Sequence, residues 1–336
     1  MEGDLRVWAV RPGLSAVDVS EDHAPAGRLC PLSEKELVVT SGDKVSIHSF
    51  ETGGSRALFR HDSWGSATVA DVKGRARLLD VDSFHNMRIF DVDTEELVIS
   101  RRDEPWRLRD GLGALLIGDT ALYFHCSKEG DIGVDVFEAS GEATTMDLFS
   151  IGVPILQMAT SFRDENVMLA LALQGSNLLI VNWNLSDGTL REVHRFQGPG
   201  AVLTTGLDIR FSSVAGSLIL AVGDGRGASP IRLHWLGDEG LIKSDELSWL
   251  GRLLDVCSVN REPWILASND SRLLLGRAAT EDPALTFDVG ARIHRAVWVQ
   301  DRIAVSTPRG LLCVQVPWKA SFPFTSRNFL RRKGFM

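Results

Sequence analysis

The sequence has no apolar run of membrane-spanning length. No segment approaches the roughly 18 uninterrupted apolar residues that a transmembrane helix needs. The first residues, from Met1 to Arg6, are acidic and polar and lack the basic and apolar regions of a signal peptide. The net charge of −8 gives no overall attraction to nucleic acid or to an anionic membrane. We therefore expect a cytoplasmic protein and no nucleic-acid ligand.

Cysteine is also scarce, with four residues in a chain of 336. The four are far apart, form no Cys-x-x-Cys pair and stand in apolar, strand-like stretches: Cys30, Cys126, Cys257 and Cys313. This pattern favours reduced cysteines in a protein core over disulfides or a zinc site. We expect no metal and no cofactor.

Signatures of catalysis are missing too. The eight histidines form no metal-binding pair such as His-x-x-Glu-His, and Gly-x-Ser-x-Gly does not occur. The glycine-rich residues 223–227 lack the Lys-Ser/Thr pair of a phosphate-binding loop and a following helix, so we interpret them as a hairpin loop. The alternating surroundings of His48 and His234 indicate strand surfaces. We assign no catalytic residues.

What the sequence does contain is a repeated strand pattern. Residues 87–96 alternate apolar and polar side chains and run into an acidic turn, which predicts a strand with one covered face. Weakened copies recur at intervals of 39 to 52 residues, with a mean of about 44. The copies align on seven positions: His48, Phe90, Phe137, Trp183, Trp235, Gly276 and Gln315. This period is typical of one four-stranded blade of a β-propeller.

The repeats predict an all-β chain, because no amphipathic helical pattern interrupts them. Each of the seven repeats supplies three strands, with the aligned position on the third. Six repeats also supply a fourth strand, which the last repeat lacks. Residues 5–10 or 16–19 can supply it, and the ring would then have no exposed sheet edge. We predict a seven-bladed β-propeller of four-stranded antiparallel blades, closed by an N-terminal strand that completes the last blade. Eight blades follow if Trp8 marks a third strand instead.

The third strands resemble WD repeats. Residues 5–10, 45–53 and 87–94 are similar to the Val-x-Val-Trp-Asp-x-x-Thr-Gly strand of that family. The Trp-Asp dipeptide is never intact, and Phe90-Asp91 and Trp183-Asn184 come closest to it. The chain thus resembles a degenerate WD-repeat (WD40-like) seven-bladed β-propeller. The resemblance implies an interaction platform without chemistry of its own.

The predicted fold gathers the fourth-to-first connections at one end of the blades, around the mouth of a central channel. These connections hold arginine and tryptophan, and we predict a partner-binding set at this mouth: Arg28, Trp64, Trp106, Arg109, Trp249, Arg252 and Arg292. Arginine forks suit carboxylate or phosphate groups, and tryptophan supplies anchoring area. Alternatively, the tryptophans wedge adjacent blades apart and the arginines pair with nearby acidic residues.

We predict a single propeller over residues 1–318, with the closing strand within residues 1–20, followed by a tail at residues 319–336. The tail has five positive charges, no acids and four phenylalanines. Its candidate contacts with a partner or an anionic lipid are Arg327, Phe329, Arg331, Arg332 and Lys333. The alternatives are contact with nucleic acid and packing of the phenylalanines against the outer strands. Membrane contact is expected only through this tail.

From these observations we predict that the protein is a non-catalytic protein-interaction scaffold or regulatory adaptor. It would bind a protein or peptide partner, including an acidic one, across the arginine and tryptophan face. The alternative is a propeller hydrolase or lyase with its site at the channel mouth, because catalytic groups can converge there from distant blades. A third interpretation is a subunit whose ring completes a larger assembly.

Overall fold

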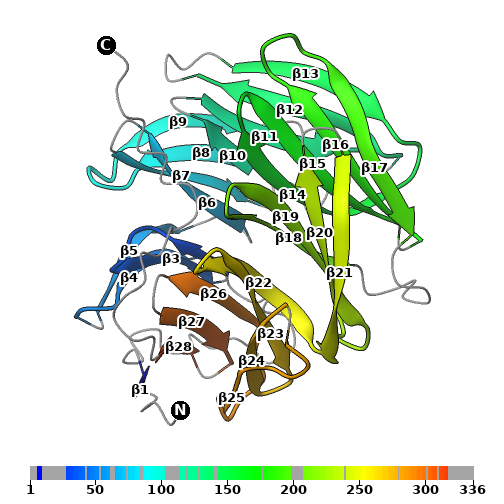
Figure 1. Ribbon diagram of the computed structural model, residues 1–336. Helices are drawn as coiled ribbons and strands as arrows, with labels where there is room; N and C mark the ends of the chain where they lie inside the picture. The colour runs from blue at the N-terminus through cyan, green and yellow to red at the C-terminus, as the bar shows by residue number, and fades with distance from the viewer. Residues whose placement is uncertain are drawn as a thin grey trace, which may run out of the picture.

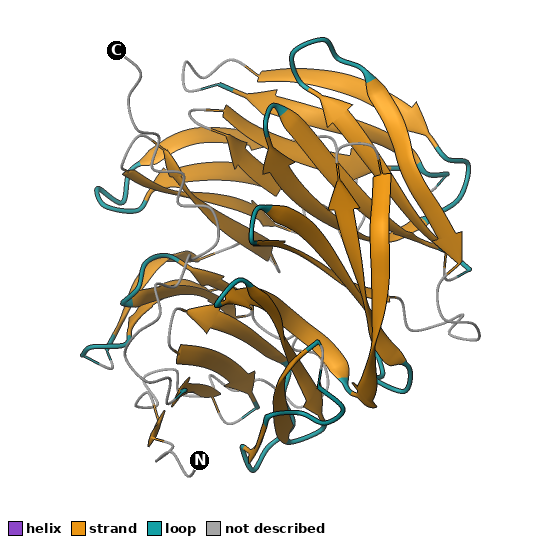
Figure 2. Ribbon diagram, viewed as in Figure 1, coloured by secondary structure: helices purple, strands orange, loops and turns teal. Residues whose placement is uncertain are grey.

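The computed structural model consists of strands and turns, with no helix among the residues it describes (Figure 2). The described residues are 6–9, 28–41, 44–52, 54–60, 65–72, 75–82, 86–102, 114–117, 120–127, 129–138, 143–175, 177–197, 207–237, 240–278, 280–299, 302–308 and 310–316. None of these residues belongs to a helix that could cross a membrane. The all-β prediction is confirmed for this part of the chain.

Within the described residues the strands form seven antiparallel sheets of four strands each. Six sheets use four consecutive strands, and the seventh joins β26, β27 and β28 to β1.

The first strands of the sheets are β2 (Arg28–Pro31), β6 (Gly65–Val72), β10 (Ala114–Ile117), β14 (Ile155–Arg163), β18 (Leu207–Val214), β22 (Arg252–Val259) and β26 (Arg295–Val299). The second strands are β3 (Glu36–Ser41), β7 (Arg75–Asp82), β11 (Thr120–Cys126), β15 (Asn166–Leu173), β19 (Ser217–Asp224), β23 (Glu262–Asn269) and β27 (Arg302–Thr307). The third strands are β4 (Lys44–Ser49), β8 (Asn86–Asp91), β12 (Asp131–Phe137), β16 (Asn177–Asn184), β20 (Pro230–Gly237), β24 (Arg272–Arg277) and β28 (Gly310–Gln315). The fourth strands are β5 (Ser55–Arg60), β9 (Leu97–Arg102), β13 (Ala143–Ser150), β17 (Leu190–Gln197), β21 (Gly240–Leu250), β25 (Leu285–Asp288) and β1 (Arg6–Ala9).

The repeat predicted from the sequence is confirmed. All seven aligned positions, from His48 to Gln315, lie on third strands, one in each sheet. The weakest copies, at Gly276 and Gln315, fall on β24 and β28. A period in the sequence therefore corresponds to one sheet in space.

The first strands lie side by side. Each is adjacent to the first strands of the sheets before and after it, and β26 lies beside β2. Figure 1 shows first strands such as β14 and β18 towards the middle of the molecule, and fourth strands such as β13 and β17 at the outside. The strand β1 pairs with β28 from Arg6 opposite Gln315 to Ala9 opposite Leu312.

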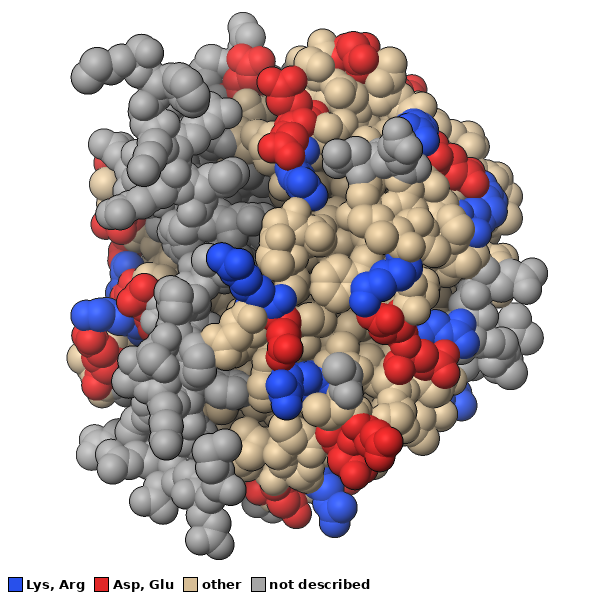
Figure 3. All heavy atoms as spheres, viewed as in Figure 1, with Lys and Arg blue, Asp and Glu red and all other residues tan. Residues whose placement is uncertain are grey.

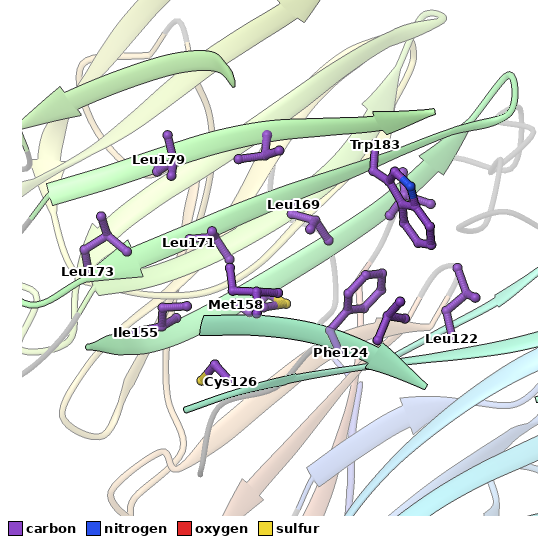
Figure 4. Packing of buried hydrophobic residues seen from close by; sticks show 14 residues of the cluster. Leu122, Phe124, Cys126, Ile155, Met158, Leu169, Leu171, Leu173, Leu179 and Trp183 are labelled. Carbon is purple, nitrogen blue, oxygen red and sulfur yellow. The ribbon is translucent and has the colours of Figure 1, made fainter. Parts of the chain in front are cut away.

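The core consists of side chains packed between neighbouring sheets, and β15 shows how. Its residues 167–173 are all buried. Leu169 and Leu171 pack in a cluster with Phe124 of the preceding sheet (Figure 4), whereas Ala170 and Ala172 pack with β18 to β20 of the following sheet. Since both faces are covered, such a strand is apolar almost throughout. Each fully buried leucine contributes about 1.5–3 kcal/mol to folding.

Aromatic residues reinforce these contacts between sheets. The rings of Phe124 and Trp183 meet edge to face, with centroids 6.2 Å apart and planes at 89° (Figure 4). Phe196 on β17 lies 4.2 Å, centroid to centroid, from His234 of the next sheet. Such pairs add roughly 0.5–1.5 kcal/mol beyond the area that they bury.

The coverage of both faces corrects the prediction that His48 and His234 lie on strand surfaces. Both are buried, with exposed fractions of 1% and 5%. His48 Nε2 lies 3.0 Å from Ser46 Oγ, and His234 Nδ1 lies 2.8 Å from Ser244 Oγ. Alternation of polar and apolar residues therefore does not indicate solvent exposure in this fold.

Candidate functional site

The first strands begin at one end of the sheets, and hydrogen bonds between sheets align these beginnings. Arg210 Nε on β18 donates to the carbonyl of Leu254 on β22 at 3.1 Å. The backbone N–H of Trp298 on β26 donates to Asp255 Oδ2 on β22, with 3.2 Å between N and O. We call this end the strand-start end. The fourth-to-first connections and the second-to-third turns lie there.

The glycine-rich residues 223–227 span the end of β19 and the first part of the turn that leads to β20, at this end, as the predicted hairpin loop. The buried carboxylate of Asp224 accepts the backbone N–H groups of Arg226, Ala228 and Ser229, which fixes the loop. Gly227 has φ +71°, and a Cβ there would lie 2.4 Å from the backbone nitrogen of Arg252. The turn therefore packs directly on the start of β22.

Arg252, the first residue of β22, bonds to the connection that precedes β26. Its Nη2 donates to the carbonyls of Ile293 and His294 at 2.8 and 2.7 Å. The side chain is half-buried, and burial lowers the pKa of its guanidinium, a change that Asp208 opposes and Arg292 reinforces. Arg252 thus holds the backbone of residues 293 and 294 in place.

Four basic residues gather around this connection, Arg252, Arg292, His294 and Arg295. Arg210 joins them through Asp208, on which Arg210, Arg252 and Arg295 all act. We call these five residues the basic cluster. Burial lowers the pKa of His294, and the positive charges of Arg292, Arg252 and Arg295 lower it further. Asp208 on β18 is a carboxylate that faces the cluster, and the carboxylate of Asp224 acts on it. Burial raises the pKa of Asp208, although Arg210, Arg252 and Arg295 act in the opposite direction. The cluster therefore concentrates positive charge in a partly desolvated place.

Arg292 is the most accessible member of the cluster. Its side chain is exposed, and its guanidinium makes no hydrogen bond or ion pair with the residues that the structure describes. Because the planar guanidinium of Arg292 is exposed, it can form two parallel hydrogen bonds to the carboxylate of a partner.

The structure brings together two of the seven predicted partner-binding residues, Arg252 and Arg292. Trp249 on β21 is buried instead, with 6% of its surface exposed, and its ring packs on Gly276 of the next sheet. This placement is the wedge between sheets that the sequence offered as an alternative. Arg28 is the first residue of β2 and pairs with Thr40.

The other predicted contacts lie outside the described residues. They are Trp64, Trp106 and Arg109 in two of the connections, and Arg327, Phe329, Arg331, Arg332 and Lys333 in the tail.

Sequence reasoning missed Asp208, Arg210 and Arg295. All three stand near the start of a first strand, where the strand is flanked by other first strands. The presence of ionic residues near the starts of first strands was the feature of the sequence that could have identified them. Their interaction with one another depends on which sheets are neighbours.

Other kinds of site have less support in the described part of the chain. No group of three or more His, Cys, Asp or Glu side chains is placed there to hold a metal ion. On the face seen in Figure 3, basic and acidic side chains are interspersed with uncharged surface. The residues drawn in colour therefore form no broad patch of one sign on that face.

Comparison with known proteins addresses the fold. No protein-family model matches the chain, and no curated protein matches its sequence. A chain of the mitotic checkpoint complex is similar in structure, with a TM-score of 0.62 at 10% identity over 95% of this chain and 100% of that one. The β-propeller domain of Cps50 (Swd1) from Myceliophteria thermophila is similar with a TM-score of 0.64 at 13% identity, over 89% of this chain and 98% of that one. These similarities show a β-propeller fold.

Proposed function

We propose that the protein is a non-catalytic interaction scaffold or regulatory adaptor of the cytoplasm, which binds a protein or peptide partner at the strand-start end. The observation that carries this proposal is the accessible guanidinium of Arg292 within a partly desolvated basic cluster. Solvent-exposed charge of this kind contributes little to folding. It is suited to recognition of a partner, because an arginine that is desolvated on binding often dominates an interface.

We also propose that the seven sheets are the blades of one closed ring over residues 1–318, completed by β1. The adjacency of all the first strands, including β26 with β2, supports this arrangement. The pairing of β1 with β28 supports the role of β1 as the fourth strand of the last blade. The tail at residues 319–336 remains a prediction.

The similarity to solved structures supports the proposed scaffold function. One of the similar chains named above belongs to the mitotic checkpoint complex, a protein assembly. Propeller folds expose loops at both ends of a rigid ring, and partners bind to such loops.

The test compares two charge reversals in a capture experiment from the native source. Arg292→Glu changes the strand-start end. Arg261→Glu changes an exposed arginine in the turn after β22, at the opposite end of the same sheet. We expect a directly binding partner, confirmed with purified proteins, that the wild type and Arg261→Glu retain and that Arg292→Glu loses by about tenfold or more.

Both variants should keep the wild-type melting temperature, because both side chains are exposed. The proposal is wrong if no protein binds the purified wild type directly, or if the two reversals weaken the partner equally.

A further inference from the structure

We propose that the basic cluster and two exposed apolar side chains, Val153 and Leu156, form one binding site for an acidic, extended peptide segment that also carries an apolar residue. This inference rests on the proposed function and specifies the chemistry of the partner. It depends on three observations: the exposed apolar pair, its structural connection to the cluster, and the accessible positive charge.

The apolar pair is presented by a rigid backbone. Val153 and Leu156 are 37% and 44% exposed. Leu156 is the extra residue of a β-bulge, because Ile155 pairs with Leu173 and Gln157 pairs with Ala172. A bulge re-aims a side chain, and here it leaves a leucine in solvent at the start of a first strand.

The connection that carries Val153 is held by the turn before β12. The backbone N–H of Ile151 donates to the carbonyl of Gly130 at 3.0 Å, and a Cβ on Gly130 would lie only 2.2 Å from the carbonyl oxygen of Val153. The apolar pair is therefore positioned before any ligand arrives, which lowers the entropic cost of binding.

Gln157 connects the apolar pair to the cluster. The strand β14 lies beside β18. In the amide orientation that satisfies both of its polar atoms, Gln157 donates to the carbonyl of Leu207 and accepts from Arg210 Nη1 at 3.1 Å. The neighbouring first strands β14, β18, β22 and β26 thus present different surfaces at the strand-start end. The surface at β14 is apolar, and the surfaces at β18, β22 and β26 carry the charged residues. One extended segment can contact both parts.

The cluster is chemically suited to an anion. Arg292 acts on Arg252 with like charge, and Arg252, Arg292 and Arg295 all do so on His294; burial of Arg252 and His294 adds a desolvation cost. A bound anion would offset both effects.

A carboxylate fits this cluster better than a phosphate. Arg252 Nη2 is already bonded to two carbonyls, so Arg292 is the accessible guanidinium, and its single positive charge balances one carboxylate. Asp208 faces the same group of arginines and would repel the second negative charge of a phosphate.

Arg252 is a positioning residue in this scheme. It donates to two successive backbone carbonyls, those of Ile293 and His294, and so orients the segment that carries Arg292. Loss of Arg252 is therefore expected to reduce both the melting temperature and peptide binding, whereas loss of Arg292 reduces binding alone.

The test is direct binding of labelled synthetic peptides to the purified full chain, measured by fluorescence anisotropy. The main probe has one leucine followed by a run of glutamates. Matched probes replace the glutamates by glutamines, replace the leucine by glycine, or replace one glutamate by phosphoserine. We expect the main probe to bind, and the glutamine probe to bind at least about tenfold more weakly.

The variants locate the site. Arg292→Ala should weaken the main probe about tenfold, the loss expected for one charge-assisted pair. Leu156→Gln should weaken that probe and leave the glycine probe unchanged. The matched controls are Arg261→Ala and Leu97→Gln, an exposed arginine and an exposed leucine at the opposite end of the sheets, and both should bind like the wild type.

Three results would overturn the inference: no binding of the main probe, binding that Arg292→Ala and Leu156→Gln leave unchanged, or phosphoserine binding about tenfold tighter than glutamate. The first two leave the proposed function intact if a captured partner still depends on Arg292. If the peptide binds but no partner is captured, the site stands and the scaffold function fails.

Discussion

At the scale of single residues, burial changes the acid–base behaviour of side chains far from the surface. His48 is almost fully buried, and burial lowers its pKa from 6.5 to about 4. The same cause lowers the pKa of His234 to about 4. Both imidazoles are therefore predominantly neutral in the folded protein at pH 5 and above.

This burial predicts a loss of stability in mild acid. As the pH falls below 6.5, the unfolded chain takes up a proton on His48 and the folded chain does not, so unfolding is favoured until the pH reaches the folded pKa. For a shift from 6.5 to about 4, the loss is about 2 kcal/mol at pH 5. We expect His48→Gln to lose about 2 kcal/mol less than the wild type between pH 7 and pH 5. Urea unfolding at the two pH values measures this difference.

His234 is unchanged in His48→Gln and provides an internal reference, since part of the acid sensitivity should remain. An identical fall in stability in the wild type and the variant would show that His48 is not responsible.

Two arginines of the basic cluster also differ in their hydrogen bonds and in their exposure to solvent. Arg252 is bonded to backbone carbonyls and contributes to the structure, whereas the guanidinium of Arg292 is exposed. The residues are alike in type, but Arg252 is the first residue of β22 and Arg292 lies in the connection that precedes β26. Their roles separate only because one side chain reaches the neighbouring sheet.

At the scale of elements, turns between strands pack against the connections of the next sheet, and glycine makes this possible. Gly130 and Gly152 both have positive φ, at +89° and +73°. A Cβ on Gly130 would collide with the backbone of Val153, whereas a Cβ on Gly152 would meet nothing within 4 Å. The two positions therefore share backbone strain and differ in crowding.

Alanine at these two glycines separates strain from crowding. Gly152→Ala should cost about 1–2 kcal/mol, the price of left-handed backbone for a residue with a Cβ. Gly130→Ala should cost at least about 2 kcal/mol more than Gly152→Ala, because the colliding atoms belong to backbone and cannot move aside. Chemical denaturation of the two variants gives both values. Equal losses would mean that the turn and the connection are not in contact in solution.

At the scale of the whole molecule, the strand β1 joins the beginning of the chain to its last sheet. It pairs with β28, which lies at the other end of the chain. Without β1, the edge of β28 would expose unpaired backbone groups, which favour association with other chains.

We expect removal of residues 1–9 to lower the free energy of unfolding by on the order of 2–4 kcal/mol, from the loss of a few backbone hydrogen bonds worth about 1 kcal/mol each. The shortened protein should also self-associate more readily, as measured by light scattering. A synthetic peptide of residues 1–12 added in excess should restore the melting temperature. Unchanged stability after the truncation would contradict closure of the ring by β1.

The sequence by itself determined the strands and their period. His48, Phe90 and Trp183 stand on third strands because local alternation and turn residues specify a hairpin wherever they occur, even in degenerate copies. The glycine-rich residues 223–227 could be interpreted as a turn for the same local reason. The identity of two cluster members, Arg252 and Arg292, followed from their place in the connections.

Only the tertiary structure decided which of these side chains are buried and which meet. His48 and His234 are buried because a second sheet covers a face that local alternation leaves open. Asp208, Arg210 and Arg295 join the cluster because β18, β22 and β26 begin next to one another. Burial and charge interaction depend on side chains that are more than 40 residues apart in the chain. The repeat pattern predicts the order of the sheets but not which side chains meet between them.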